Sequence, residues 1–115
     1  MKIAIPSTGT KLDSPLNPWF GRTLNFVLYD DARGEYEVVE NTEHRNSEQG
    51  AGIQAAEMLA QHGVQCLLAR QCGPKAIKVL EAAGIEVHTT TALTVAAALA
   101  EFHADGVTVH PVPTD

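Results

Sequence analysis

The segment Gln71-Cys72-Gly73-Pro74-Lys75 has residue types that suit anion binding. It follows an apolar run typical of a buried strand, and Pro74 is suited to the first position of a helix. The first turn of a helix exposes unpaired N–H groups and the positive end of the helix dipole, and both attract anions. Lys75 adds a formal charge, and Cys72 offers a thiol whose pKa a helix N-terminus would lower. The simpler alternative is a well-capped helix preceded by an ordinary loop cysteine.

A second glycine-containing helix start lies earlier in the chain. Gly50-Ala51-Gly52 opens a predicted helix, and its two glycines would let a ligand approach the backbone closely. The alternative is that the glycines only give a flexible entry into the helix. His44 and Arg45 lie in the polar segment before it. His44 could ligate a metal, donate a hydrogen bond, or simply be solvated.

The loop from Asp13 to Arg22 separates two apolar strands. Its two prolines fix φ and remove backbone donors, so neither strand can continue through it. A rigid loop of this kind can deliver Phe20, Gly21 and Arg22 to the end of a sheet, where binding sites are common. Arg22 is then a ligand-binding cation or an ordinary surface arginine. Trp19 and Phe20 are either anchors in the core or a wall of the pocket.

Composition argues against several classes of protein. The 115 residues are 44% hydrophobic, which suits one domain with a real core. The net charge of −6 argues against nucleic acid and anionic membrane surfaces as partners, because both reward clustered cations. We see no secretory signal and no apolar run near the roughly 20 residues of a membrane span, so we expect a cytoplasmic protein.

Catalytic machinery is not apparent. Two cysteines six positions apart, Cys66 and Cys72, form neither a disulfide framework nor a Cys-x-x-Cys site, and Cys66 is expected in the core. There is no Gly-x-Ser-x-Gly or His-Glu-x-x-His motif. The first strand carries no carboxylate that could hold the ions of a two-metal nuclease. A nucleophilic Cys72 with His44 as base is a disfavoured alternative, and we expect no enzymatic activity.

Periodicity and turn residues predict strands over 2–6, 24–29, 35–40, 64–69 and 85–88, and helices over 50–62, 74–83 and 93–103. Acids alternate along 35–40, which indicates an exposed edge strand, whereas 64–69 is almost continuously apolar, like a central parallel strand. Thr91 or Thr94 should cap the last helix. A helix–glycine–strand pattern recurs at Gly106-Val107 and predicts a short strand over 107–109.

These elements predict one α/β domain over residues 1–106 and a C-terminal tail over 107–115. A hairpin followed by helix–strand units gives a mixed sheet of about five strands with helices on both faces. Ligands usually bind beyond the C-terminal ends of parallel strands. The loops 7–22, 41–52 and 70–75 can converge there.

Taken together, the motifs resemble the dinitrogenase iron–molybdenum cofactor biosynthesis family of small nitrogenase accessory and orange-protein-like carriers. The resemblance covers residues 2 to about 106 and rests on Met1 to Pro6, Asp13-Ser14-Pro15, Phe20-Gly21-Arg22, Gly50 to Glu57, Gly73 to Ala76 and Ala82 to Ile85. It differs at three places. Trp19 stands where the family often has histidine, Arg70-Gln71 replaces a frequent Gly-Asn, and Cys72 occurs in only some members.

The resemblance implies a ribonuclease H-like three-layer fold with one antiparallel strand, without nuclease activity. It also implies non-covalent handling of an anionic metal–sulfur cluster, either iron–molybdenum or molybdenum–copper sulfide, and a cluster-delivery or ATPase protein as a possible partner. Arg22, Arg70 and Lys75 would neutralise the cluster, and amides at Gly50, Gly52 and Gly73 would donate to its sulfides.

Two functions therefore remain open from the sequence. The preferred hypothesis is a non-catalytic cluster carrier in which Cys72 or His44 either ligates metal directly or only lines the pocket. The rival hypothesis is a regulatory or interaction module that binds a small anionic metabolite or a protein partner. A carrier should become coloured after reconstitution with molybdate, copper and sulfide, whereas a metabolite module should not.

Overall fold

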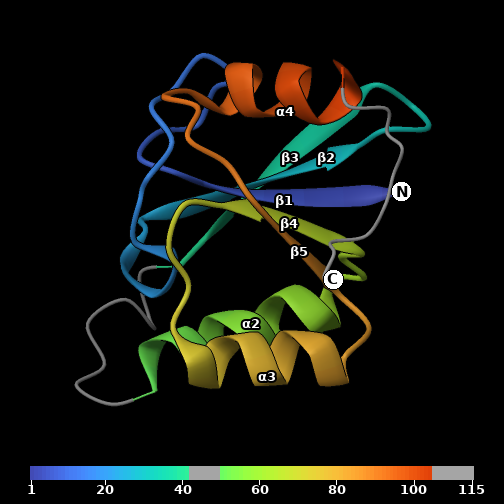
Figure 1. Cartoon of the computed structure of the whole chain (residues 1–115). Helices are drawn as coiled ribbons and strands as arrows, with labels where there is room; N and C mark the ends of the chain where they lie inside the picture. Colours follow the sequence, from blue (N-terminus) through green and yellow to red (C-terminus); the bar gives the residue numbers. More distant parts are fainter. Residues whose placement is uncertain (42–49, 105–115) are drawn as a thin grey trace.

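The computed structural model describes residues 1–41 and 50–104, and Figure 1 shows how their strands and helices alternate. The strands are β1 (Lys2–Ser7), β2 (Asn25–Asp30), β3 (Glu35–Glu40), β4 (Cys66–Ala69) and β5 (Glu86–Thr89). The helices are α2 (Ala51–Gln61), α3 (Pro74–Ala82) and α4 (Val95–Ala104), with a short 3₁₀ turn η1 (Phe20–Arg22). His44 and the strand expected over 107–109 lie outside the described residues.

The five strands form one mixed sheet in the order β3-β2-β1-β4-β5. β2 pairs antiparallel with both β1 and β3, while β1 pairs parallel with β4 and β4 with β5. Only β2 therefore runs against the other strands. The predicted mixed sheet is confirmed, with β3 at an edge and β4 inside, because the acidic alternation of one and the apolar run of the other report their exposure correctly.

Helices cover both faces of the sheet: α2 and α3 pack on one face and α4 on the other (Figure 1). Successive strand residues point to opposite faces. Leu67 therefore joins Phe26 and Leu80 in the core under α2 and α3, whereas Leu68 joins the core under α4. Both cores are built from buried apolar side chains, which explains why residues 3–5 of β1 and the whole of β4 are apolar.

Three local details differ from the sequence prediction. β4 starts at Cys66, because the Val64 N–H donates to the Leu59 carbonyl at the end of α2 (3.2 Å) and does not join the sheet. α4 starts at Val95, since Thr94 is its cap: the Thr94 hydroxyl accepts the Ala97 N–H at 3.1 Å. The η1 turn was not expected. Within residues 1–41 and 50–104, no helix combines the length and apolarity of a membrane span.

Candidate functional site

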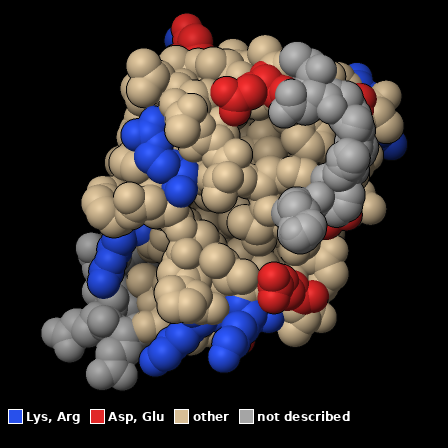
Figure 2. Space-filling model, viewed as in Figure 1, with Lys and Arg blue, Asp and Glu red and all other residues tan. Residues whose placement is uncertain are grey.

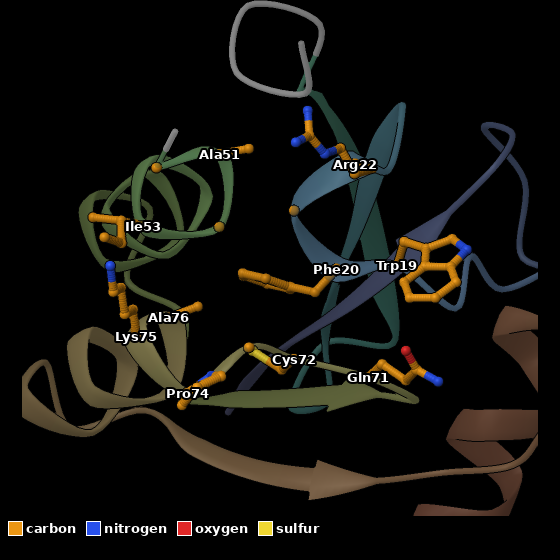
Figure 3. A pocket seen from close by; sticks show the side chains of 14 residues that line it. Trp19, Phe20, Arg22, Ala51, Ile53, Gln71, Cys72, Pro74, Lys75 and Ala76 are labelled. Atoms are coloured by element: carbon orange, nitrogen blue, oxygen red, sulfur yellow. The ribbon is translucent and has the colours of Figure 1, made fainter. Parts of the chain in front are cut away.

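Three separate segments line one cavity of about 600 Å³. They are residues 19–22, 50–53 and 71–76, which follow the C-terminal ends of β1, β3 and β4 (Figure 3). These strands all run in the same direction, so their ends meet at one edge of the sheet. The cavity therefore lies where ligands commonly bind in α/β sheets.

Close backbone packing brings these segments together. A Cβ placed on Gly21 would lie 2.8 Å from the Gly52 nitrogen, so η1 rests directly on the first turn of α2. A Cβ placed on Gly52 would lie 3.2 Å from the Ala76 Cβ, so the same turn also packs tightly on α3. Gly50 has a left-handed φ of 82°, which favours glycine at the helix entry. Packing and entry geometry thus account for the two glycines of the Gly50-Ala51-Gly52 motif.

The η1 turn is anchored from several sides. The Phe20 N–H donates to the Gln71 carbonyl (3.3 Å), and the Asn41 side chain donates to the carbonyls of Gly21 (3.4 Å) and Thr23 (3.0 Å). The Phe20 ring is only 2% exposed and packs on Phe26 with ring centroids 5.3 Å apart. Phe20 is thus a core anchor that also forms the floor of the cavity.

The apolar part of the cavity is centred on that floor. Figure 3 shows the Phe20 ring pointing between α2 and the loop after β4, with the Cys72 thiol and the Ala76 methyl group directed toward the same space. Trp19 and Gln71 lie to one side and point away from this centre (Figure 3). The Trp19 side chain is 57% exposed, so Trp19 lies at the surface while its neighbour Phe20 is buried in the core.

Two helix N-termini open into the cavity. The first helical hydrogen bond of α2 joins the Gln54 N–H to the Gly50 carbonyl (2.8 Å), and that of α3 joins the Ile77 N–H to the Gly73 carbonyl (3.0 Å). The N-cap residues are Gly50 and Gly73, which have no side chain to cap the helix, and neither helix has an acidic residue in its first turn. The first-turn amides of both helices therefore make no hydrogen bond to the described residues and remain donors for a ligand.

Arg22 and Lys75 also line the cavity, and both side chains are exposed. They lie on different sides of the Phe20 ring (Figure 3). In Figure 2 most Lys and Arg side chains show along the left, on the side where the loops after β1 and β4 lie, and along the bottom, with a few at the right edge, while Asp and Glu show at the top, right and lower right. On the face that Figure 2 shows, cations therefore outnumber acids along this side.

The structure does not bring Arg70 together with the other predicted site residues. Its side chain is not part of the cavity lining and turns instead toward the loop before α4. There the guanidinium donates to the carbonyls of Thr91 (3.2 Å) and Ala92 (3.3 Å). The reason is alternation: Arg70 continues the side of β4 that carries Leu68, which packs under α4. Arg70, although it directly follows β4, therefore points to the α4 side of the sheet and away from the cavity.

The prediction for the Cys72 pKa is wrong. Burial raises the pKa of this thiol from an ordinary value of 9.0 to about 11. The side chain packs against the core under α2 and α3, and the loss of water there outweighs the helix N-terminus. Burial raises the pKa of Cys66 to about 12, with the Glu86 carboxylate as a smaller cause. Both cysteines are protonated at neutral pH, so Cys72 lines the site as a neutral thiol.

The cavity includes residues that sequence reasoning did not assign to it, notably Ala51, Ile53, Pro74 and Ala76. Their place in the sequence could have identified them, because all four lie in the first turn of α2 or α3, and both helices were predicted. Among the residues that the structure describes, no three His, Cys, Asp or Glu side chains gather as a metal site. His44, the second predicted metal ligand, lies outside them.

Comparison with known proteins places this geometry in a family. Residues 1–105 match the family model described as dinitrogenase iron-molybdenum cofactor. An uncharacterized protein of Methanocaldococcus jannaschii is 36% identical over 91 residues, which cover 76% of this chain and 73% of that protein.

Two solved structures share the fold and much of the sequence. The apo form of the orange protein from Desulfovibrio gigas is 40% identical, with a TM-score of 0.85 over 91% of this chain and 88% of that chain. A Thermotoga protein, proposed to be a NifB protein and assigned to the DUF35 family, is 32% identical with a TM-score of 0.78. That alignment covers 98% of both chains.

Proposed function

Because the chain belongs to the dinitrogenase iron-molybdenum cofactor family, we propose that it is a non-catalytic carrier of an anionic metal–sulfur cluster. The cargo is a cluster of the iron–molybdenum or molybdenum–copper sulfide class, held by charge and hydrogen bonds. The similarity to the orange protein supports this class of cargo. The strand order β3-β2-β1-β4-β5, with β2 alone reversed, supports the ribonuclease H-like classification that the sequence resemblance implies.

One observation carries the proposal: two uncapped helix N-termini face the same cavity as two cationic side chains. The first turns of α2 and α3 supply backbone donors, and Arg22 and Lys75 supply formal charge. Each N-terminus has an effective positive charge of about half a unit. A multiply charged anion gains from all four contributions at once, whereas a neutral ligand gains little.

The floor of the cavity favours sulfide over oxygen as the surface of that anion. Phe20, Ile53 and Pro74 give it an apolar wall, and Cys72 adds a neutral, polarizable thiol. A phosphate oxygen placed against such a wall would lose water without gaining a hydrogen bond. Sulfide ligands are softer and bind water less tightly, so a cluster can turn sulfides toward the floor and still meet the amides at the rim.

Cys72 has two possible parts in this carrier. As a neutral thiol it can line the pocket beside the cargo. As a direct ligand it must first release its proton, because the thiolate is the form that binds metal. Its raised pKa makes cluster uptake through a Cys72–metal bond weaker at low pH and coupled to proton release. His44, outside the described residues, stays a proposed second ligand.

The test is a titration of the protein with tetrathiomolybdate and, separately, with inorganic phosphate at low salt, where charge effects are largest. We expect saturable tetrathiomolybdate binding with a change in its visible spectrum, and at least about tenfold weaker phosphate binding. Reconstitution with molybdate, copper and sulfide should leave coloured protein after gel filtration. Preferential phosphate binding, with no retained colour, would favour the metabolite module instead.

A matched pair of variants isolates the charge at the site. Lys75→Gln removes a cation that lines the cavity, while Lys78→Gln removes the same charge one turn later on α3, outside the lining. We expect Lys75→Gln to weaken tetrathiomolybdate binding severalfold and Lys78→Gln to have a smaller effect. Equal effects would mean that the cationic end attracts anions generally and that the cavity does not hold them.

A further inference from the structure

The two most exposed large apolar side chains that the structure describes stand on segments that meet beside the cavity. Trp19 is 57% exposed and Leu93 is 74% exposed. Their segments are tied together, since the Leu16 N–H donates to the Leu93 carbonyl (2.9 Å). Trp19 also forms a parallel bridge with Gln71, and the two side chains point the same way, away from the Phe20 floor (Figure 3). We call Trp19, Arg70, Gln71 and Leu93 the Trp19–Leu93 face.

Arg70 gives this face an unbalanced charge. Its guanidinium is half-buried and donates to the carbonyls of Thr91 and Ala92, but it makes no ion pair with the described residues. Its Nε N–H is buried and has no hydrogen-bond partner among the described residues. Partly buried charge without a counter-ion is unfavourable. A carboxylate brought by another molecule would supply the missing counter-charge to the part of the guanidinium that solvent reaches, while the buried Nε stays inside.

We propose that the Trp19–Leu93 face docks an acidic protein surface with an apolar centre, on the partner that exchanges the cluster with the adjacent cavity. This partner role rests on the proposed function, because Trp19 and Gln71 belong both to the face and to the cavity lining. Exposed tryptophan and arginine are the residue types that dominate binding at protein interfaces. Docking here places the partner at the mouth of the cavity, so the cluster can pass without crossing bulk water.

The charges argue for an acidic partner and against a second copy of this chain. A two-fold interface on this face would bring Arg70 of one copy toward Arg70 of the other, and like charges at an interface are repulsive. Other Lys and Arg side chains show on this side of the molecule (Figure 2), and a second copy would bring them together as well. An acidic surface removes both problems, and its encounter with this end of the molecule would be accelerated by charge.

The experiment uses a peptide with a central Leu-Phe pair flanked by glutamates, and a counterpart in which every glutamate is glutamine. Trp19 is the only tryptophan, so its fluorescence reports binding at the face directly. We expect a blue shift that saturates with the glutamate peptide, weakens with added salt, and needs at least about tenfold more of the glutamine peptide. Equal affinity for the two peptides would overturn the proposal.

Variants outside the cavity lining locate the contact. Leu93→Ser and Arg70→Gln should each weaken peptide binding about tenfold, since interface residues of this kind commonly contribute more than 1 kcal/mol. Tyr36→Ser is the control, because Tyr36 is 41% exposed on the edge strand β3, away from the face. If Arg70→Gln does not fold, Arg70→Lys is used instead, because it keeps the charge. The effect of Leu93→Ser and the salt dependence of peptide binding then test the proposal. Loss of binding in the Tyr36 variant equal to that in Leu93→Ser would overturn the proposal.

Two further measurements separate this proposal from its rivals. Leu93→Ser should bind tetrathiomolybdate as tightly as the parent, because Leu93 does not line the cavity. If the parent binds the glutamate peptide but no tetrathiomolybdate, the carrier function is contradicted and the docking face is not. Gel filtration with light scattering should show a monomer, and a short single-stranded oligonucleotide should bind more weakly than the glutamate peptide. A dimer lost in Leu93→Ser, or tighter oligonucleotide binding, would overturn the acidic protein partner.

Discussion

The start of α4 and the starts of α2 and α3 differ in how their backbone N–H groups are used. The three N–H groups of the first turn of α4 all bond within the protein: Val95 to the Ser14 carbonyl (3.0 Å), Ala96 to the Leu12 carbonyl (2.7 Å) and Ala97 to the Thr94 hydroxyl. The first-turn N–H groups of α2 and α3 make no such bond to the described residues, and they border the cavity.

This contrast shows how one fold can assign different tasks to similar helix ends. Buried or crowded N–H groups need partners, and the long loop before β2 supplies them to α4. Glycine at both other helix starts provides no side chain that could cap them. The described residues therefore stabilise one helix end internally and leave the first-turn amides of the other two without a partner, and in the proposed carrier these amides donate to the anion.

The largest effect is expected where the open helix end of α2 meets η1. Gly21→Ala would put a methyl group 2.8 Å from the Gly52 nitrogen, which must then move away. We expect the free energy of unfolding to fall by about 1–3 kcal/mol, as for other overpacked sites. Tetrathiomolybdate binding should weaken as well, because the shift displaces the first turn of α2. Urea unfolding and the anion titration measure the two effects.

Gly73→Ala is the matched control in the same cavity. A Cβ on Gly73 meets nothing within 4 Å, and the residue has an ordinary φ of −65°. Its free energy of unfolding should stay within about 0.5 kcal/mol of the parent. If this variant unfolds as easily as Gly21→Ala, close packing does not explain the glycines. If it is stable but binds no anion, the ligand must approach the backbone at Gly73 itself.

The second prediction compares charge placed at an open and at a closed helix end. Lys75→Glu puts a carboxylate in the first turn of α3, where it competes with the ligand for the amides. We expect at least about tenfold weaker tetrathiomolybdate binding at low salt. Ala97→Glu puts the same charge in the first turn of α4 and should raise the free energy of unfolding by about 0.3–1 kcal/mol. Its anion affinity should be unchanged, and a comparable loss there would contradict the assignment of the site.

Most of the architecture could be predicted because each element has a local cause. The acids of β3 indicate that this strand is exposed, and the apolar run of β4 indicates that this strand is buried. The glycines after the helices mark where each helix ends. All of these signals come from neighbouring residues alone. Two site features could not be predicted in this way. The Arg70 direction depends on which side of the sheet the chain continues from Leu68, and the Cys72 pKa depends on burial against residues distant in the sequence. Both are set by packing, on which sequence motifs carry no information.

The cap of α4 provides a third prediction. Thr94→Ala removes the hydroxyl that accepts the Ala97 N–H, and loss of such a cap costs about 1 kcal/mol. Thermal or urea unfolding should show this loss, while tetrathiomolybdate affinity stays at the parental value. A reduced affinity would mean that α4 and the cavity are coupled, and that the division between the two kinds of helix end is incomplete.

The last expected effect, which is negligible at neutral pH, is a pH dependence from the thiol at the open end. Burial raises the pKa of Cys72 to about 11 in the folded protein, above its ordinary value of 9.0. Below pH 9 the thiol is protonated in both states, so its contribution to stability is constant. Between about pH 9 and 11 the unfolded chain loses the proton first, so the free energy of unfolding falls as pH rises. Cys72→Ser should show a shallower fall over the same range, and this difference removes the contribution of other titrating groups.

Alkylation gives an independent measure of the same thiol. In the native protein Cys72 should react slowly near neutral pH, but faster than the fully buried Cys66, whose pKa is raised to about 12. Rapid alkylation of Cys72 near pH 7, together with equal pH slopes for the parent and Cys72→Ser, would show that the two open helix ends stabilise the thiolate more than burial opposes it.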